Sequence, residues 1–217
     1  MSAPAVENSS SPLPQQGRFV GRLLGRSDFA IISEMVEPGS KVLDLGCGDG
    51  ELLAWLAENK QVIARGVEIS PACVQRCIAQ GLSVYQGDID KGLADYPNQC
   101  FDFVILSQTL QETHHPLEVL REMLRVGRRV IVAFPNFGHW SMRLSMLLAG
   151  RMPKTKQFPY EWYNSPNIHF LTVQDFEDLA VAENLTVEHR IFLRGDHRVQ
   201  SLPNLLAQVA VYLVRKK

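Results

Sequence analysis

Apolar residues along this chain fall into short runs that alternate with helix-like patterns. Runs typical of buried strands cover residues 42–45, 62–69, 83–86, 101–107 and 129–134. Between or before these runs, patterns with one apolar helical face begin near Asp28, Glu51, Pro71 and Pro116. Strands that alternate with helices predict an α/β fold with a doubly wound, mostly parallel sheet.

The alternation stops after Phe134. Residues 135–167 form an insertion longer than an ordinary connection, and long segments of this kind inside a compact domain are usually functional. Thr172 then caps a further helix, and strand-like runs at 185–193 and 208–214 are expected to form an antiparallel C-terminal edge. The pattern therefore predicts seven strands in a single domain over residues 18–217. Residues 1–17, rich in Ser, Pro, Asn and Gln, are expected to be a disordered tail.

Within the insertion, the run WSMRLSMLLA at 140–149 is compatible with a helix but too apolar for an ordinary surface helix. Its apolar members are Trp140, Met142, Leu144, Met146, Leu147 and Leu148. It either forms a lid over a ligand site or provides a protein-binding surface with Trp162 and Tyr163, rimmed by Arg143, Arg151, Lys154 and Lys156. We expect a mixture, with one face inward and one towards a partner.

The stretch VLDLGCGDGELL places Gly46, Gly48 and Gly50 in a turn between a strand and a helix. Glycine allows positive φ and a close approach of the backbone to a ligand. A dinucleotide-binding fingerprint would need Gly or Ala at position 51, where this chain has Glu51. The acidic pair Asp49 and Glu51 would also repel a pyrophosphate. S-adenosylmethionine (SAM) carries no phosphate and has two cationic groups, so it fits this turn better.

Acidic residues follow the strands where such a ligand would lie. Glu68 ends the second strand about twenty residues after the turn, where doubly wound folds place an acceptor for ribose hydroxyls. The turn resembles motif I of the class I SAM-dependent methyltransferases. That resemblance implies that Asp44 orients the methionine end, that the backbone near Ser107 receives the ammonium, and that Asp88 contacts the adenine amino group. Ile89 would pack on the adenine ring, and Ile69 is included among the cofactor-binding residues. SAM or its product S-adenosylhomocysteine (SAH) is the expected cofactor.

No catalytic residue is evident. The chain lacks the acceptor motif of amino-group methyltransferases after the strand at 101–107. His114, His115, His139 and His169 are candidate bases, but each is more simply explained as a surface or hydrogen-bonding residue.

The four cysteines lack the spacing of a zinc site, so no metal is expected. The net charge of −1 gives no general attraction to nucleic acid or anionic lipid. Without an apolar span or signal core, we expect a cytoplasmic protein.

Longer sequence segments indicate a narrower family within the methyltransferase-like proteins. The segments LDLGCGDGELL, FDFVILSQTLQ, REMLRVGRRVIVAFPNFGHW and RMPKTKQFPYEWYNSPNIHFLTVQDFE resemble the MetW family of bacterial methionine-biosynthesis proteins, over about residues 27–193. This resemblance implies a role beside a MetX-type homoserine O-acyltransferase. Two hypotheses follow: an accessory subunit that binds SAM as an effector, or an active methyltransferase on an unknown small-molecule or protein acceptor. A third, a methyltransferase-like fold that has lost its ligand, is disfavoured by Asp44, Glu68 and Asp88.

Overall fold

A computed structural model of the protein describes residues 26–155 and 158–217. The predicted tail at 1–17, and Lys156 of the predicted basic rim, lie outside the described residues. The helices are α2 (Ser27–Met35), α3 (Glu51–Lys60), α4 (Pro71–Ala79), α5 (Pro116–Val126), α6 (Trp140–Ala149), α7 (Val173–Ala182) and α8 (Pro203–Leu206), with short 3-10 turns η1 (Ile89–Lys91) and η2 (Leu110–Glu112). The strands are β1 (Lys41–Leu45), β2 (Ile63–Glu68), β3 (Val84–Gln86), β4 (Phe101–Ser107), β5 (Gly127–Pro135), β6 (Leu185–Arg194), β7 (His197–Arg198) and β8 (Val209–Lys216).

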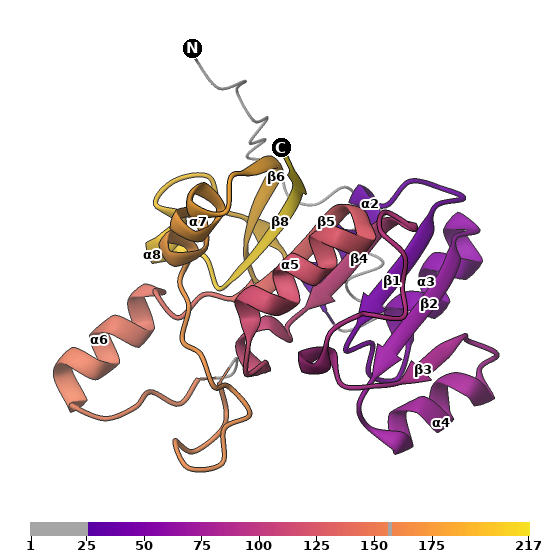
Figure 1. Ribbon diagram of the computed structural model, residues 1–217. Coiled ribbons are helices and arrows are strands. Elements are labelled where there is room, and N and C mark those ends of the chain that lie inside the picture. The colour runs from indigo at the N-terminus through magenta and orange to yellow at the C-terminus, as the bar shows by residue number, and fades with distance from the viewer. Residues whose placement is uncertain (1–25, 156–157) are drawn as a thin grey trace.

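All of these strands belong to one sheet, in the order β3-β2-β1-β4-β5-β8-β6-β7 (Figure 1). β1 to β5 are parallel, whereas β8 pairs antiparallel with both β5 and β6. The predicted α/β fold with an antiparallel C-terminal edge is confirmed, with one correction to the strand count. An eighth strand, β7, pairs with β6 across the turn at Gly195. Its two polar residues carry no apolar alternation, so the pattern gave no sign of it.

The strand order places the reversal of winding between β1 and β4. From β1 the chain adds β2 and β3 on one side, and then returns to add β4 and β5 on the other. In doubly wound sheets, a crevice opens at such a point, at the carboxyl ends of the two central strands. The glycine turn after β1 and the loop after β4 therefore meet there.

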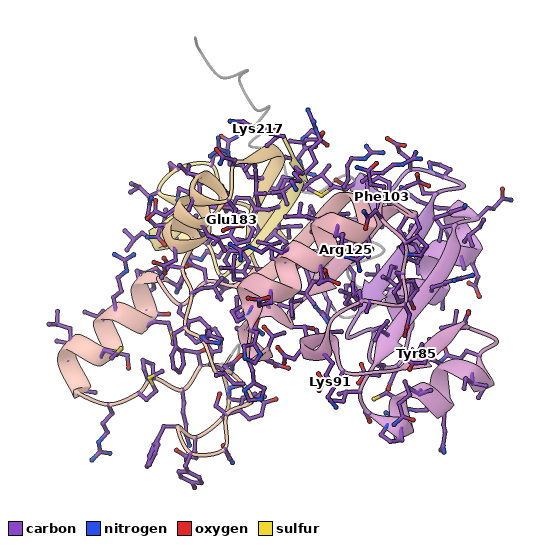
Figure 2. The ribbon with its side chains drawn as sticks, viewed as in Figure 1. Tyr85, Lys91, Phe103, Arg125, Glu183 and Lys217 are labelled. Atoms are coloured by element: carbon purple, nitrogen blue, oxygen red, sulfur yellow. The ribbon has the colours of Figure 1, made fainter. Side chains whose placement is uncertain are left out.

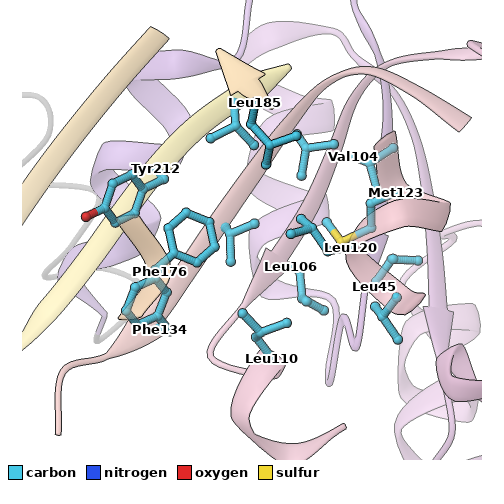
Figure 3. Close-up of a cluster of buried hydrophobic side chains, with 14 of the residues drawn as sticks. Leu45, Val104, Leu106, Leu110, Leu120, Met123, Phe134, Phe176, Leu185 and Tyr212 are labelled. Atoms are coloured by element: carbon cyan, nitrogen blue, oxygen red, sulfur yellow. The ribbon is translucent and has the colours of Figure 1, made fainter. Parts of the chain in front are cut away.

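Helices cover both faces of the sheet, and each face has its own hydrophobic cluster. One cluster joins Leu45 of β1 to Met123 of α5 and Phe176 of α7, as Figure 3 shows. The other joins Val42 of β1 to Leu56 of α3 and to α2. Alternate residues of a strand point to opposite faces, so near-continuous apolar strands supply both clusters.

Two helix starts predicted from capping residues are confirmed. The Ser70 hydroxyl accepts a hydrogen bond from the Cys73 amide, ahead of Pro71 in α4. In α7, the Thr172 hydroxyl accepts from the Asp175 amide while the Asp175 carboxylate accepts from the Thr172 amide. Such reciprocal bonds satisfy amides that the first helical turn leaves without partners.

The insertion after β5 extends to Val173, where α7 begins, slightly beyond the predicted 135–167. Its predicted helix is confirmed as α6, which projects away from the sheet (Figure 1). Within residues 26–155 and 158–217, every helix is too short or too polar to span a lipid bilayer.

The base of the insertion is tied to three other elements through Asn136, whose side chain is fully buried. Its amide nitrogen donates to the carbonyls of Ala207 and Asn204, at 2.8 and 3.2 Å. Its amide oxygen accepts from the backbone N–H groups of Gly138 and Val173, at 3.0 and 3.3 Å. One side chain therefore fixes the end of β5 against α8, α7 and the start of the insertion.

Candidate functional site

The turn between β1 and α3 requires its glycines. Gly46, Gly48 and Gly50 have φ values of 68°, 56° and 79°, in the left-handed region that other residues adopt only with strain. A Cβ on Gly46 would also lie 2.9 Å from the Thr109 hydroxyl, whereas a Cβ on Gly48 would meet nothing within 4 Å. Gly48 is thus needed for its conformation and borders open space.

Glu68, at the end of β2, is held in place by this turn. One of its carboxylate oxygens accepts from the Gly48 amide at 2.9 Å, and the other accepts from the Ser70 amide at 2.8 Å. The side chain is 8% exposed. Each carboxylate oxygen has a second lone pair, so an oriented Glu68 can still accept hydrogen bonds from a ligand.

Two cavities meet at Gly46. The first, of about 220 Å³, is lined by Gly46, Val67, Glu68, Ile69, Gly87, Asp88, Ile89, Asp90, Thr109, Glu112 and Thr113. The second, of about 270 Å³, is lined by Arg26, Phe29, Asp44, Gly46, Cys47, Gly48, Asp49, Glu51 and Ser107. We call them the Glu68 cavity and the Asp44 cavity. Of the nine residues predicted to bind a cofactor, only Gly50 lines neither; a Cβ there would clash with Leu82.

The Glu68 cavity combines apolar and acidic groups. Ile69 is 63% exposed at its wall, and Ile89 is half-buried and packs on the core. The Asp88 carboxylate accepts from the Asp90 amide at 3.0 Å, and this bond fixes its direction at the start of η1. Burial, with the charge of Glu68, raises the pKa of Glu112. Apolar walls with carboxylates at their edge fit a flat ring that carries hydrogen-bond donors.

The Asp44 cavity contains a buried carboxylate. Asp44 is 4% exposed, and no hydrogen bond from the described residues reaches its side chain. Burial raises the pKa of Asp44 to about 7, and the charges of Glu68 and Asp28 add to this rise while that of Arg26 opposes it. An unpaired buried carboxylate is costly, so the site is suited to a ligand that brings a positive charge.

A polar network that the sequence did not predict borders the same cavity. The Arg26 guanidinium donates to the Asp28 carboxylate at 2.5 Å and to the Ser107 hydroxyl at 2.8 Å, and it lies 4.1 Å from the centre of the Phe29 ring. The Ser107 hydroxyl in turn donates to Asp28 at 2.6 Å. These contacts join the start of α2 to the end of β4, about eighty residues apart, and no local motif announces them.

The four candidate histidines do not line either cavity. The backbone amides of His114 and His115 donate to the Asp90 carboxylate. His139 caps α6 and lies 2.7 Å from the Ser141 hydroxyl, and burial lowers its pKa. The backbone amide of His169 donates to the carbonyl of Gln111 at 3.0 Å. These bonds involve the backbone in three of the four histidines, and only the His139 side chain serves as a helix cap.

Related sequences agree with this geometry. Over 197 residues the chain is 36% identical to the bifunctional methionine biosynthesis protein MetXA/MetW of Rhodopirellula baltica, covering 85% of this chain and 32% of that protein. It is 34% identical over 94 residues to ajmaline N-methyltransferase of Rauvolfia serpentina, covering 40% of this chain and again 32% of the relative. The chain thus spans about a third of the length of these curated relatives.

Solved structures and a family model complete the comparison. A SAM-dependent methyltransferase of Thermotoga maritima, described as a possible histamine N-methyltransferase, superposes with a TM-score of 0.64 at 18% identity, over 93% of this chain and 98% of that one. A SAM-dependent methyltransferase of Mesorhizobium loti gives 0.64 at 17% identity, over 86% and 96%. The fold is therefore that of the SAM-dependent methyltransferases. The model of the family "Methionine biosynthesis protein MetW" matches residues 26–214, and the chain belongs to this family.

Proposed function

We propose that the protein binds SAM or SAH across its two cavities. Glu68 would accept hydrogen bonds from the ribose hydroxyls, and Asp88 from the adenine amino group beside Ile69 and Ile89. Asp44 would face the ammonium of the methionine part, near Ser107. The buried carboxylate of Asp44 supports this proposal, because burial raises its pKa despite the charge of Arg26, and a ligand ammonium would stabilise its ionised form. Bound SAM would supply a sulfonium methyl group, and these residues would bind and orient it.

We further infer that the protein acts as an accessory or regulatory partner of a MetX-type homoserine O-acyltransferase. The observation that carries this inference is the relative in which a MetXA part and a MetW part share one chain. Two proteins that are fused in one organism often work side by side where they are separate. The absence of a histidine from both cavities agrees with a role in binding more than in chemistry.

The test uses the homoserine acyltransferase of the same organism, purified separately. Its rate of acyl transfer to homoserine is measured alone, with this protein, and with this protein plus SAM or SAH. We expect the protein to form a complex with the enzyme and to raise the rate, and SAM or SAH to change the size of that effect. An unchanged rate together with no complex would remove the partner from the proposal.

An active methyltransferase is the alternative function, supported by methyltransferase relatives such as ajmaline N-methyltransferase. Methyl transfer relies mainly on alignment of the acceptor with the sulfonium, so a missing base does not exclude it. Labelled SAM incubated with an extract of the native host would reveal a methylated product. That product, lost in a Glu68→Ala variant, would favour the alternative.

A further inference from the structure

The face of α6 that meets solvent is apolar. Trp140 and Leu144 are 40% and 42% exposed, and Leu147 and Leu148 are 80% and 76% exposed. At a spacing of four, seven and eight residues from Trp140, these side chains share one face of the helix. Helices that insert into a groove of a partner protein present anchors at this spacing.

The opposite face of α6 is the less apolar one. Met142 is the only residue of the helix that is buried, and Ser141 and Ser145 are the half-buried ones. A surface helix of a globular protein normally turns its apolar face inward. In α6 this arrangement is reversed, and the side chains of the helix extend into solvent away from the sheet (Figure 2).

Exposed apolar residues are also numerous in the rest of the insertion. Of the seventeen large apolar residues that are exposed in the described parts of the chain, eleven lie between residues 140 and 170. They are Trp140, Leu144, Met146, Leu147, Leu148, Met152, Tyr160, Trp162, Tyr163, Ile168 and Phe170. A concentration of this kind marks an interaction site, and aromatic and Met side chains are typical of interfaces.

The helix is held firmly at its base. Arg143 donates to the carbonyl of Gly138 at 2.6 Å and to that of Asn204 at 3.3 Å. With Asn136, these bonds fix the start of α6 against the body of the molecule. A helix presented in a fixed position loses little entropy when a partner covers it.

The charges around the helix indicate which partner fits. In this part of the chain Lys154 is paired with Glu161, whereas Arg143 and Arg151 form no ion pair with a carboxylate of the described residues. In a symmetric contact between two copies the same patch meets itself, so these positive charges would repel. An apolar groove with acidic residues at its rim would attract them instead.

We propose that α6 docks into an apolar, acid-rimmed groove of the homoserine acyltransferase, with Leu147 and Leu148 as central anchors. This inference rests on the proposed function, because the fused relative identifies the partner. The groove would cover the surface of α6 that the chain itself leaves exposed. The two cavities on the sheet would remain open to their ligand.

The experiment compares two variants for binding to the purified acyltransferase. In Leu147→Ser/Leu148→Ser, both anchors become polar. Because both side chains are exposed, this variant should keep its fold, and circular dichroism and SAM calorimetry check that it does. We expect the dissociation constant to rise about thirtyfold or more. The matched control is Val181→Ser on α7, which is 78% exposed and should stay within about twofold of the wild type.

The outcomes separate the two proposals. If the wild type does not bind the acyltransferase, the proposed function fails. If the wild type binds and the double variant binds equally well, the interface lies elsewhere and this inference is overturned. Two other results would also overturn it. If the wild type sediments as a dimer that the double substitution dissociates, a second copy of the chain covers α6. If deletion of residues 1–25 increases the binding of an apolar dye to α6, that segment covers the helix. Arg151→Glu should weaken the complex and reduce its dependence on salt.

Discussion

At the scale of single residues, Glu68 is the acceptor that we propose for the ribose hydroxyls of the ligand. Replacement by Ala removes the charged acceptor for two ribose hydroxyls, a loss of roughly 1.5 to 3 kcal/mol in binding free energy. Calorimetry with SAM and SAH should show a ten- to hundredfold weaker dissociation constant. The exposed Glu58→Ala on α3 is the control and should bind as the wild type does. Equal affinity in Glu68→Ala would exclude the ribose assignment.

The raised pKa of Asp44 leads us to expect that SAM binding depends on pH. Its pKa of about 7 means that the carboxyl is partly protonated near neutrality, and a ligand ammonium favours the ionised form. SAM affinity should therefore rise about five- to tenfold between pH 6 and 7.5. Above this range the amino group of SAM itself, with a pKa near 8, begins to lose its proton. In Asp44→Asn, the affinity for SAM should be lower, and it should no longer rise between pH 6 and 7.5.

The same carboxyl affects the stability of the ligand-free protein in the opposite direction. A folded-state pKa above the unfolded value of about 3.9 means that the folded state binds the proton more tightly. The contribution of Asp44 to stability is therefore full below pH 4 and is lost as the pH rises to about 7. Bound SAM would compensate for this loss, because its ammonium stabilises the ionised carboxylate.

At the scale of elements, Asn136 decides whether β5, α7, α8 and the insertion remain joined. In Asn136→Ala, the Ala207 carbonyl and the amides of Gly138 and Val173 lose the hydrogen bonds that the side chain makes, and the Asn204 carbonyl keeps only its bond from Arg143. We expect the free energy of unfolding to fall by roughly 3 to 5 kcal/mol, measured by urea denaturation. Asn59→Ala removes one exposed bond to the Trp55 carbonyl and should cost less than about 1 kcal/mol. Similar losses in the two variants would contradict this role of Asn136.

Elements and site residues with local signals could be predicted from the sequence. The glycine turn, Glu68 after β2 and the cap at Ser70 each depend on neighbours in the chain, and the structure places them as expected. The Arg26 network depends on contact with Ser107 across about eighty residues, which no spacing rule reports. The apolar periodicity of α6 predicted a helix, but which face packs inward depends on tertiary contacts.

At the scale of the whole molecule, the loop after β4 connects the ligand site to the insertion. Glu112 and Thr113 line the Glu68 cavity, and the carbonyl of the neighbouring Gln111 accepts from the amides of Ile168 and His169, at 2.8 and 3.0 Å. A ligand that orders this loop would also order the segment that carries the proposed docking surface. These hydrogen bonds thus join the proposed SAM site to the segment that carries the proposed docking surface.

This connection predicts coupled binding. We expect SAM to change the affinity for the acyltransferase by about fivefold or more, and the acyltransferase to change the affinity for SAM by the same factor. Two titrations measure it: the partner with and without saturating SAM, and SAM with and without saturating partner. A factor of one in both would mean that the two sites act independently, and SAM would then not be an effector.

The place of β8 in the sheet has a consequence for synthesis. β8 lies between β5 and β6, although it follows both in the chain. While residues 209–216 are still inside the ribosome, β5 lacks its antiparallel neighbour, and β6 has no strand through which to join the sheet. The nascent protein therefore waits with an open sheet edge, a template for aggregation, until its last described strand emerges.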